Sequence, residues 1–254
     1  MERREIYSIL ERDYFGPNAI EADELRLIEP YLREADLFVD LGASLGQYTK
    51  FANEKMRPGA SIISVEADLV RYERLVEVSA GWAKASNRQI EPVHAAISDK
   101  AGRVSFSVTD SNVRGSLTPI AGRGDAWRTV EVQSTTLDSL LGSEKRKSIL
   151  IKMDVEGSEY LALAGARELL ASDNAVGFFI ELHPWGNGGK YADDCIKLLR
   201  QAGFGAVKLA GHTYFARGLS QKRMGAMARR EYAKRMLRQV PGLLKLRQAI
   251  RPYL

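Results

Sequence analysis

Short apolar segments alternate with helical ones through most of the chain, and this alternation limits the fold more than any other feature of the sequence. Apolar strands are expected at 37–42, 61–67, 90–98, 148–155 and 175–183. The residues between most of them have the length and the apolar period of helices. Strands separated by helices of about 10 to 15 residues form a parallel sheet with helices on both faces. We therefore predict an α/β fold with a mostly parallel, seven-stranded sheet.

Charge divides the chain into parts. The net charge is +5 overall, but residues 217–254 hold eleven Lys and Arg against a single acid, Glu231. Apolar residues recur at every fourth position from Met224, which predicts a basic amphipathic helix in this tail. We expect a helical N-terminal segment at 1–34, a folded α/β domain at 35–216 and the basic tail at 217–254.

The tail and the composition indicate where the protein resides. The start of the chain has charges every few residues, and no segment reaches the ~20 apolar residues of a membrane span. Cys195 is the only cysteine, so an intrachain disulfide and a cysteine-based zinc cluster are excluded. We expect a cytoplasmic protein. Its tail could lie on the anionic inner membrane surface, bind a polyanion such as RNA, or pack on a neighbouring subunit of a homo-oligomer.

Charged side chains stand at the ends of the predicted strands. In parallel sheets, ligands bind beyond the carboxyl ends of the strands, near the point where the strand order reverses. The residues that end the five strands are Asp40, Glu66, Ala96, Asp154 and His183. Three of these five are carboxylates, and a buried acid is costly unless it has a partner or a task. We therefore expect these residues to line the ligand site.

The sequence DLGASLG, from Asp40 to Gly46, predicts a tight turn that holds a ligand. Gly42 and Gly46 let the backbone approach a ligand, whereas a P-loop is excluded because Gly-Lys-Ser/Thr is absent. A dinucleotide fingerprint would have glycine in place of Ser44, and the charge of Asp40 would oppose a pyrophosphate. That charge suits the ammonium and sulfonium groups of S-adenosylmethionine, so we predict this methyl donor. Glu66 would bind the ribose hydroxyls, as it also would in an NAD enzyme.

Six stretches of the chain resemble FkbM-type methyltransferases and occur in the same order: FVDLGASLGQYT, ISVEAD, VHAAISDKAGRVSF, STTLDSLL, ILIKMDVEGSEYLALAGA and FFIELH. The resemblance spans residues 37–183, and KMDVEGSE is its most specific part. Departures are small: many relatives have Asn in place of Ser44 and Pro in place of Ala67. The resemblance implies a Rossmann-like class I methyltransferase fold. It also implies S-adenosylmethionine-dependent O-methylation of a hydroxyl on a sugar, glycan or related natural product.

The stretch KMDVEGSE would hold the catalytic acids. The resemblance places Asp154 beside the reactive end of the donor, where it could orient the acceptor hydroxyl or take its proton. Glu156 is a second candidate, and His183 is a rival base because an imidazole titrates near neutral pH. Glu159 is expected only to favour the dipole of the helix that it begins. Oxygen ligands with one imidazole, such as these with Glu181, would suit magnesium, but no ligand spacing requires a metal and we do not favour one.

Two loops could contact the acceptor. The segment 110–128 has Arg114, Arg123 and Arg128, which would favour an anionic sugar or a phosphate. Trp185 precedes a glycine-rich segment that could act as a hinged lid. Two other functions stay open: an RNA methyltransferase guided by the basic tail, and a non-catalytic nucleotide-binding or membrane-associated partner protein. Methylation of an adenine nitrogen is disfavoured because the fourth strand ends in MDVE instead of Asn/Asp-Pro-Pro-Tyr/Phe.

Overall fold

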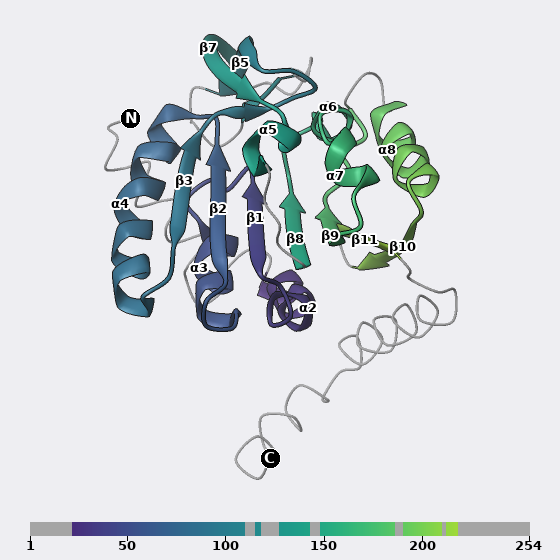
Figure 1. Cartoon of the computed structure of the whole chain (residues 1–254). Helices are drawn as coiled ribbons and strands as arrows, with labels where there is room; N and C mark the ends of the chain where they lie inside the picture. The colour runs from purple at the N-terminus through teal and green to yellow at the C-terminus, as the bar shows by residue number, and fades with distance from the viewer. Residues whose placement is uncertain are drawn as a thin grey trace, which may run out of the picture.

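The computed structural model describes residues 22–109, 115–117, 127–142, 148–185, 190–209 and 212–217, which Figure 1 draws as a coloured ribbon. The predicted N-terminal segment is therefore described only from Ala22, and the basic tail after Arg217 lies outside the described residues. Among the helices in these ranges, none is both long enough and apolar enough to cross a bilayer.

Within the described residues, seven strands form the main sheet: β1 (Leu37–Leu41), β2 (Ser61–Glu66), β3 (Ile90–His94), β8 (Ser148–Met153), β9 (Ala175–Ile180), β10 (Phe204–Leu209) and β11 (His212–Arg217). Their order is β10-β11-β9-β8-β1-β2-β3. Only β11 runs antiparallel to its two neighbours, β9 and β10. The predicted mostly parallel, seven-stranded sheet is confirmed.

The order of the strands reverses beside β1. The chain first builds β2 and β3 on one side of β1 and then crosses so that β8 pairs with its other side. Ligands bind at the carboxyl ends of the strands that flank such a reversal. In Figure 1 the arrowheads of these strands point toward β5 and β7, at the top of the molecule. The ligand site is therefore to be sought between the main sheet and these two strands.

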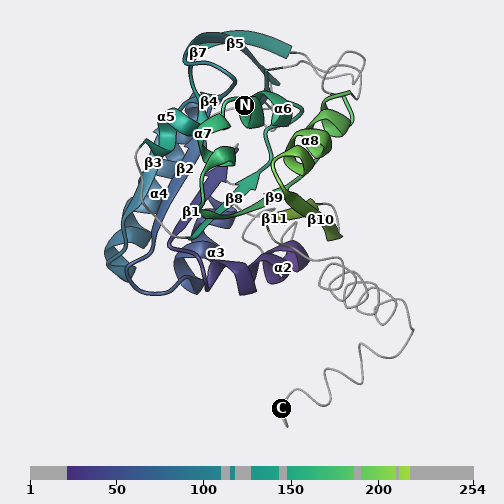
Figure 2. The same ribbon diagram turned by 45° about the vertical axis from the view of Figure 1, so that its right-hand side comes forward.

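Helices cover both faces of the main sheet (Figure 2). One face holds α2 (Ala22–Leu32) and α3 (Gln47–Lys55), and α4 (Leu69–Ser86) packs against α3 and β3. The other face holds α5 (Leu137–Leu141), α6 (Glu159–Ala164), α7 (Arg167–Ala171) and α8 (Lys190–Gln201). Side chains alternate between these faces along each strand. Thus Val39 belongs to the core under α5 to α8, and its neighbour Phe38 belongs to the core under α2 and α3.

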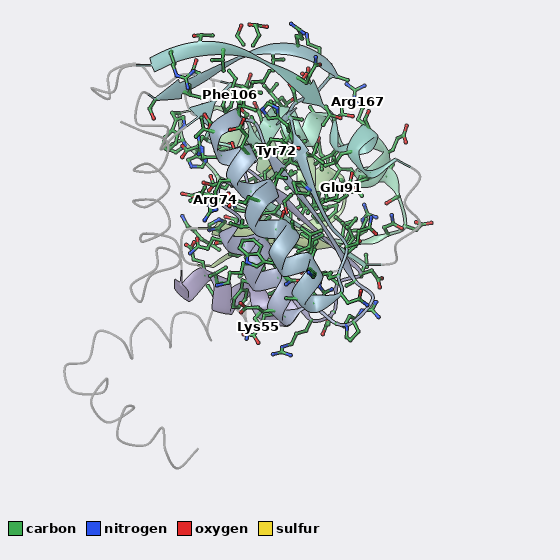
Figure 3. The ribbon with its side chains drawn as sticks, turned by 90° about the vertical axis from the view of Figure 1, so that its left-hand side faces the viewer. Lys55, Tyr72, Arg74, Glu91, Phe106 and Arg167 are labelled. Carbon is green, nitrogen blue, oxygen red and sulfur yellow. The ribbon has the colours of Figure 1, made fainter. Side chains whose placement is uncertain are left out.

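A second, smaller sheet lies across the carboxyl ends of the parallel strands (Figure 1). It is formed by β4 (Ala96–Ile97), β5 (Gly102–Thr109), β6 (Gly115–Ser116) and β7 (Trp127–Thr135), in the order β4-β7-β5-β6. Phe106, Val108 and Val132 of this sheet pack on Ala67 and Ala96. Figure 3 shows Phe106 close to the N-terminal end of α4, on the side of the small sheet that faces the main sheet. The small sheet thus covers the end of the main sheet where a ligand is expected.

Two predicted elements are divided in the structure. The expected strand 90–98 ends as β3 and continues as β4 after Ala95, because β4 leaves the main sheet to pair with β7. The expected single helix at 158–172 is divided into α6 and α7 at Gly165. A side chain at this glycine would place its Cβ 2.3 Å from the carbonyl oxygen of Ser98. The carboxylate of Asp138 then accepts hydrogen bonds from the first turn of α7, so a new helix begins there.

Candidate active site

A hollow of about 650 Å³, part of it open to solvent, lies between the two sheets, and its size suits a small-molecule ligand. Six of the predicted site residues line it: Gly42, Ser44, Glu66, Ala96, Asp154 and Glu156. Apolar side chains, including Phe106 of β5 and Leu117, which follows β6, form the other wall. Three of the five predicted strand ends, Glu66, Ala96 and Asp154, therefore meet at this pocket, whereas Asp40 and His183 do not line it. The pocket also borders the turn after β1.

The turn after β1 needs backbone conformations that most residues avoid. Gly42, Ser44 and Gly46 all have positive φ, of 73°, 51° and 85°. A Cβ at Gly42 would lie 1.9 Å from the carbonyl oxygen of Asp154, so only glycine fits there. Gly46 instead makes room for α4, because a Cβ there would lie 2.8 Å from the side chain of Leu75. The structure thus places Gly42 and Ser44 at the pocket and Gly46 away from it.

Glu66 fixes the other side of this turn. Its two carboxylate oxygens accept hydrogen bonds from the backbone N–H groups of Ser44 and Asp68, both at 2.8 Å. The side chain is buried and lines the pocket. Because a carboxylate has about four acceptor positions, two remain after these bonds. Glu66 can therefore still accept hydrogen bonds from the paired hydroxyls of a ribose.

Asp40 lies behind the pocket wall. Its side chain is fully buried and accepts a hydrogen bond from Thr49 Oγ1 at 2.8 Å. Burial raises the pKa of this carboxyl, an effect that Lys152 and Thr49 partly oppose. Asp40 does not belong to the pocket lining. Its contact with the donor stays a prediction. In the structure it lies 3.7 Å from Nζ of Lys152, which donates a hydrogen bond to the carbonyl of Gly42 in the turn.

Lys152 is a site residue that the sequence reasoning missed. Its Nζ donates a hydrogen bond to the carbonyl oxygen of Gly42 at 3.1 Å and lies 3.7 Å from Asp40 and 3.6 Å from Asp154. Lys152 and Asp40 are partners in the register of β8 and β1, so both face the same side of the sheet. A signal was available, since Lys152 is a single charge in the otherwise apolar SILIKM.

Asp154 stands at the end of β8, beside the turn. Its side chain is 22% exposed, and its Oδ1 has no hydrogen-bond partner among the described residues. Burial alone would raise the pKa of this carboxyl, but the charges of Lys152 and His183 outweigh burial and hold the pKa below its ordinary value. Asp154 is therefore an ionised carboxylate that lines the pocket, and its buried Oδ1 lies 3.8 Å from Nε2 of His183.

Glu159 and His183 form a buried pair, which corrects the expectation that Glu159 only favours a helix dipole. Glu159 is 1% exposed, and its Oε1 lies 2.8 Å from Nδ1 of His183 and accepts a hydrogen bond from Gly157 N at 3.0 Å. No signal in the sequence distinguishes Glu159 from an ordinary acid in a first helical turn. Its role follows only from the arrangement of β9 beside α6.

His183 is charged at neutral pH, which weakens the expectation that it acts as a general base. Burial lowers the pKa of its imidazole, but the hydrogen bond and charge of Glu159, with the charges of Asp154 and Glu156, raise the pKa to about 9. An imidazole that already holds a proton cannot accept another. Nε2 points toward Asp154, Glu156 and Glu181, at 3.8, 3.8 and 3.7 Å.

Glu156 and Trp185 complete the site. Glu156 has a positive φ of 52°, and its carbonyl oxygen accepts hydrogen bonds from Ser116 Oγ at 2.6 Å and Trp185 Nε1 at 3.3 Å. The ring of Trp185 lies 4.4 Å from that of His183. Trp185 is thus beside the pocket, while 186–189 of the predicted lid lies outside the described residues.

Two further groups of residues lie away from the pocket lining or outside the described residues. His212, where the preceding glycine predicts a turn, instead begins β11; it is fully buried, stacks on Phe179 and lies 3.1 Å from Glu24 of α2. Of the predicted loop arginines, Arg128 lies on β7, while Arg114 and Arg123 lie outside the described residues. His212 and Arg128, which the structure describes, do not line the pocket.

Comparison with known proteins identifies the family of the chain. The model of the FkbM methyltransferase domain matches residues 40–205. The chain belongs to the FkbM methyltransferase family. A hexuronic acid methyltransferase, AglP of Haloferax volcanii, is 27% identical over 187 residues, which cover 72% of this chain and 69% of that protein.

Solved structures with a similar fold include two O-methyltransferases. One, from Bacillus cereus in complex with S-adenosylhomocysteine, is 11% identical, with a TM-score of 0.48 over 84% of this chain and 88% of that chain. The other, TomG of Streptomyces achromogenes in complex with S-adenosylmethionine, is 13% identical, with a TM-score of 0.47 over 85% and 88%.

Membership of the FkbM methyltransferases confirms three predictions: the family, the class of enzyme and S-adenosylmethionine as the methyl donor. The family match lies inside the predicted domain at 35–216, whose exact bounds stay a prediction. The pocket of this FkbM methyltransferase also fits the donor chemically. Glu66 has acceptor positions left for ribose hydroxyls, and the buried Oγ of Ser44 and Oδ1 of Asp154 have no hydrogen-bond partner among the described residues.

Proposed function

We propose that this FkbM methyltransferase transfers a methyl group from S-adenosylmethionine to a hydroxyl of a sugar, with a hexuronic acid as the favoured acceptor. The observation that carries the proposal is the ionised Asp154, which lines the same pocket as Gly42 and Glu66 and whose buried Oδ1 has no hydrogen-bond partner among the described residues. The class of acceptor rests on the relative that is named a hexuronic acid methyltransferase. Arg114 and Arg123, which lie outside the described residues, would add contacts to an anionic acceptor.

Asp154 would position the acceptor hydroxyl for this reaction. When bound, S-adenosylmethionine supplies an electrophilic methyl group on a sulfonium. The acceptor oxygen bonds to the methyl carbon while the bond from that carbon to sulfur breaks, and S-adenosylhomocysteine is left. The hydroxyl proton goes to Asp154. Because the oxygen becomes strongly acidic as it is methylated, a carboxylate with a low pKa is sufficient as the base.

His183 would position Asp154 rather than act as the base. Its imidazolium lies 3.8 Å from Asp154 and is held by Glu159 at 2.8 Å. A positive charge in this place keeps Asp154 ionised and therefore able to accept the proton. The three predicted catalytic residues thus receive different tasks: Asp154 contacts the acceptor, His183 orients Asp154, and Glu156 borders the acceptor side of the pocket.

A methyl-transfer assay tests the proposal. The full chain is incubated with S-adenosylmethionine and a methyl glucuronoside, with the neutral methyl glucoside in parallel, and products are detected by mass spectrometry. We expect the glucuronoside to gain one methyl group. Asp154→Asn should lower kcat by about 10²- to 10⁴-fold and still bind S-adenosylhomocysteine. The matched control is Glu91→Gln, an exposed acid on β3 (Figure 3).

Two results would contradict the proposal. One is full activity in Asp154→Asn. The other is a protein that binds S-adenosylhomocysteine but methylates no sugar in a panel of uronic acids and neutral sugars.

A further inference from the structure

Three side chains beside the donor turn are arranged as the ligands of a metal ion. Asp154, Glu156 and His183 each offer one ligand atom, and these atoms lie within 4.8 Å of one another. Two ligands of one ion can be separated by at most twice the length of a metal–ligand bond. This limit is about 4.2 Å for Mg²⁺ and about 5 Å for the longest bonds to Ca²⁺. The observed spacing therefore fits a bound divalent ion with small side-chain movements.

The orientation of His183 is an independent observation. The side chain is 4% exposed, and Glu159 holds its Nδ1 at 2.8 Å. In the described part of the chain, Nε2 has no hydrogen-bond partner, although it lies 3.7 to 3.8 Å from three carboxylates, those of Asp154, Glu156 and Glu181. A carboxylate that orients a histidine from behind is the usual arrangement around a metal-binding imidazole.

The negative charge around the imidazole of His183 also favours a bound cation. Four carboxylates surround the imidazole of His183: Asp154, Glu156, Glu159 and Glu181. The neighbouring cation, Lys152, is shared, since it lies 3.6 Å from Asp154 and 3.7 Å from Asp40. Like charges this close raise the free energy of the folded chain unless a cation lies between them. A proton on Nε2 of His183 supplies one positive charge when no ion is bound. A divalent ion bound there would take the place of this proton and supply two charges, so that Asp154 stays ionised in either state.

The backbone of Glu156 is strained, and a role as a metal ligand would explain the strain. Its φ of 52° is unfavourable for a residue with a Cβ, and the next residue, Gly157, also has a positive φ of 96°. Such strain costs about 1 to 3 kcal/mol and is typical of functional sites. Hydrogen bonds from Ser116 and Trp185 to the Glu156 carbonyl keep the residue in place. As a result, its carboxylate lies 3.8 Å from Nε2 of His183.

We propose that Asp154, Glu156 and His183 bind one divalent cation, Mg²⁺ or Mn²⁺, beside the methyl donor. Two carboxylates with one imidazole and open positions for water or substrate suit these ions, whereas Ca²⁺ prefers six to eight oxygen ligands. Glu181, 3.7 Å from Nε2 of His183, is close enough to bind through a water molecule.

The task of the ion rests on the proposed function, although its binding does not. The ion would hold the oxygen atoms of an acidic sugar next to Asp154 and offset the repulsion between the sugar's carboxylate and the acids of the site. It would also lower the pKa of the acceptor hydroxyl, which makes the proton easier for a carboxylate to take.

Metal binding is tested on the full chain without donor or acceptor. The protein is treated with a chelator, dialysed and titrated with Mn²⁺, and free Mn²⁺ is measured by electron paramagnetic resonance. We expect one site per chain, from which Mg²⁺ displaces Mn²⁺. Asp154→Asn and Glu156→Gln should each weaken Mn²⁺ binding by at least tenfold, whereas the control Glu91→Gln should bind as the unchanged chain does. Glu156 lies on the pocket wall and is partly exposed, so Glu156→Gln is the variant least at risk of unfolding.

The outcomes separate this proposal from the proposed function. The metal site is overturned if the chain has no stoichiometric Mn²⁺ site, if Glu156→Gln binds Mn²⁺ unchanged, or if only Zn²⁺ binds. If the site is present but no sugar is methylated, the proposed function fails and the metal site stands. If a sugar is methylated at the full rate in excess chelator and no Mn²⁺ binds, the function stands and the metal site fails.

Discussion

Lys152 shows how much of the site depends on one buried side chain. It lies between Asp40 and Asp154 and also donates to the carbonyl of Gly42. We expect Lys152→Met to lower the free energy of unfolding by about 3 to 5 kcal/mol, because the fully buried Asp40 and the partly buried Asp154 would lose their shared cation. Urea denaturation measures the change, with the exposed Lys208→Met as the matched control. A Lys152→Met chain as stable as the unchanged one would refute this role.

Substitutions at Gly42 and Gly59 separate the effect of a steric clash with Asp154 from the effect of backbone strain. Both have positive φ, of 73° and 80°, but a Cβ at Gly59 would meet no atom within 4 Å. Gly59→Ala should therefore lower the free energy of unfolding only by the cost of a positive φ at alanine, about 1 to 2 kcal/mol. It should leave binding of S-adenosylhomocysteine unchanged.

Gly42→Ala should cost more stability than Gly59→Ala and weaken binding of S-adenosylhomocysteine by at least tenfold, because the turn must move away from Asp154. Thermal unfolding and calorimetry measure the two effects. Equal effects of the two substitutions on binding would show that the contact between Gly42 and Asp154 does not shape the pocket.

His183 makes stability depend on pH. Its pKa is raised from the ordinary value of 6.5 to about 9 in the folded chain. The contribution of its proton is therefore fully present below pH 6.5 and is lost as the pH rises through 9. In excess chelator, the free energy of unfolding should fall by a few kcal/mol across that interval.

Nuclear magnetic resonance tests the cause of this dependence, since the chain has only three histidines. One imidazole should titrate near pH 9, and Glu159→Gln should bring that pKa down. Three imidazoles that all titrate near 6.5 would contradict the buried pair of Glu159 and His183.

At the scale of elements, the small sheet formed by β4 to β7 is the roof of the pocket. Phe106 of β5 lines the pocket, whereas Val132 of β7 lies in the same apolar cluster but not in the pocket lining. Both Phe106→Ala and Val132→Ala should lower stability, the former by about 3 to 5 kcal/mol. Only Phe106→Ala should also weaken the binding of S-adenosylhomocysteine, by several-fold in calorimetry. Equal binding by both variants would mean that the roof does not contact the donor.

The alternation of strands and helices was sufficient to predict the main sheet and the strand ends that meet at the pocket. Asp154, Glu66 and Gly42 could be selected because a parallel sheet brings all its carboxyl ends to one edge. Lys152 and Glu159 could not be placed in the same way, since their roles depend on which element packs above them. The division of the helical segment 158–172 into α6 and α7 could not be predicted either. It depends on the contact of Gly165 with Ser98, a residue that lies far away in the sequence.

At the scale of the whole molecule, the proposed donor and acceptor sites meet at one reversal of strand order. In this proposal the turn after β1 and the end of β2 hold the donor, and the acids that follow β8 and β9 face the acceptor. The basic tail lies outside the described residues, and its place on a membrane, a polyanion or a second subunit stays a prediction. We propose that the pocket binds the donor through the turn after β1 and Glu66.

Titration calorimetry of the full chain with S-adenosylhomocysteine tests this claim most directly. We expect one binding site per chain, binding weakened by about 10- to 100-fold in Glu66→Gln, and unchanged binding in the exposed control Glu91→Gln. NADH should not bind. Equal affinity of Glu66→Gln and the unchanged chain for S-adenosylhomocysteine, or binding of NADH in its place, would contradict the assignment of this pocket to the methyl donor.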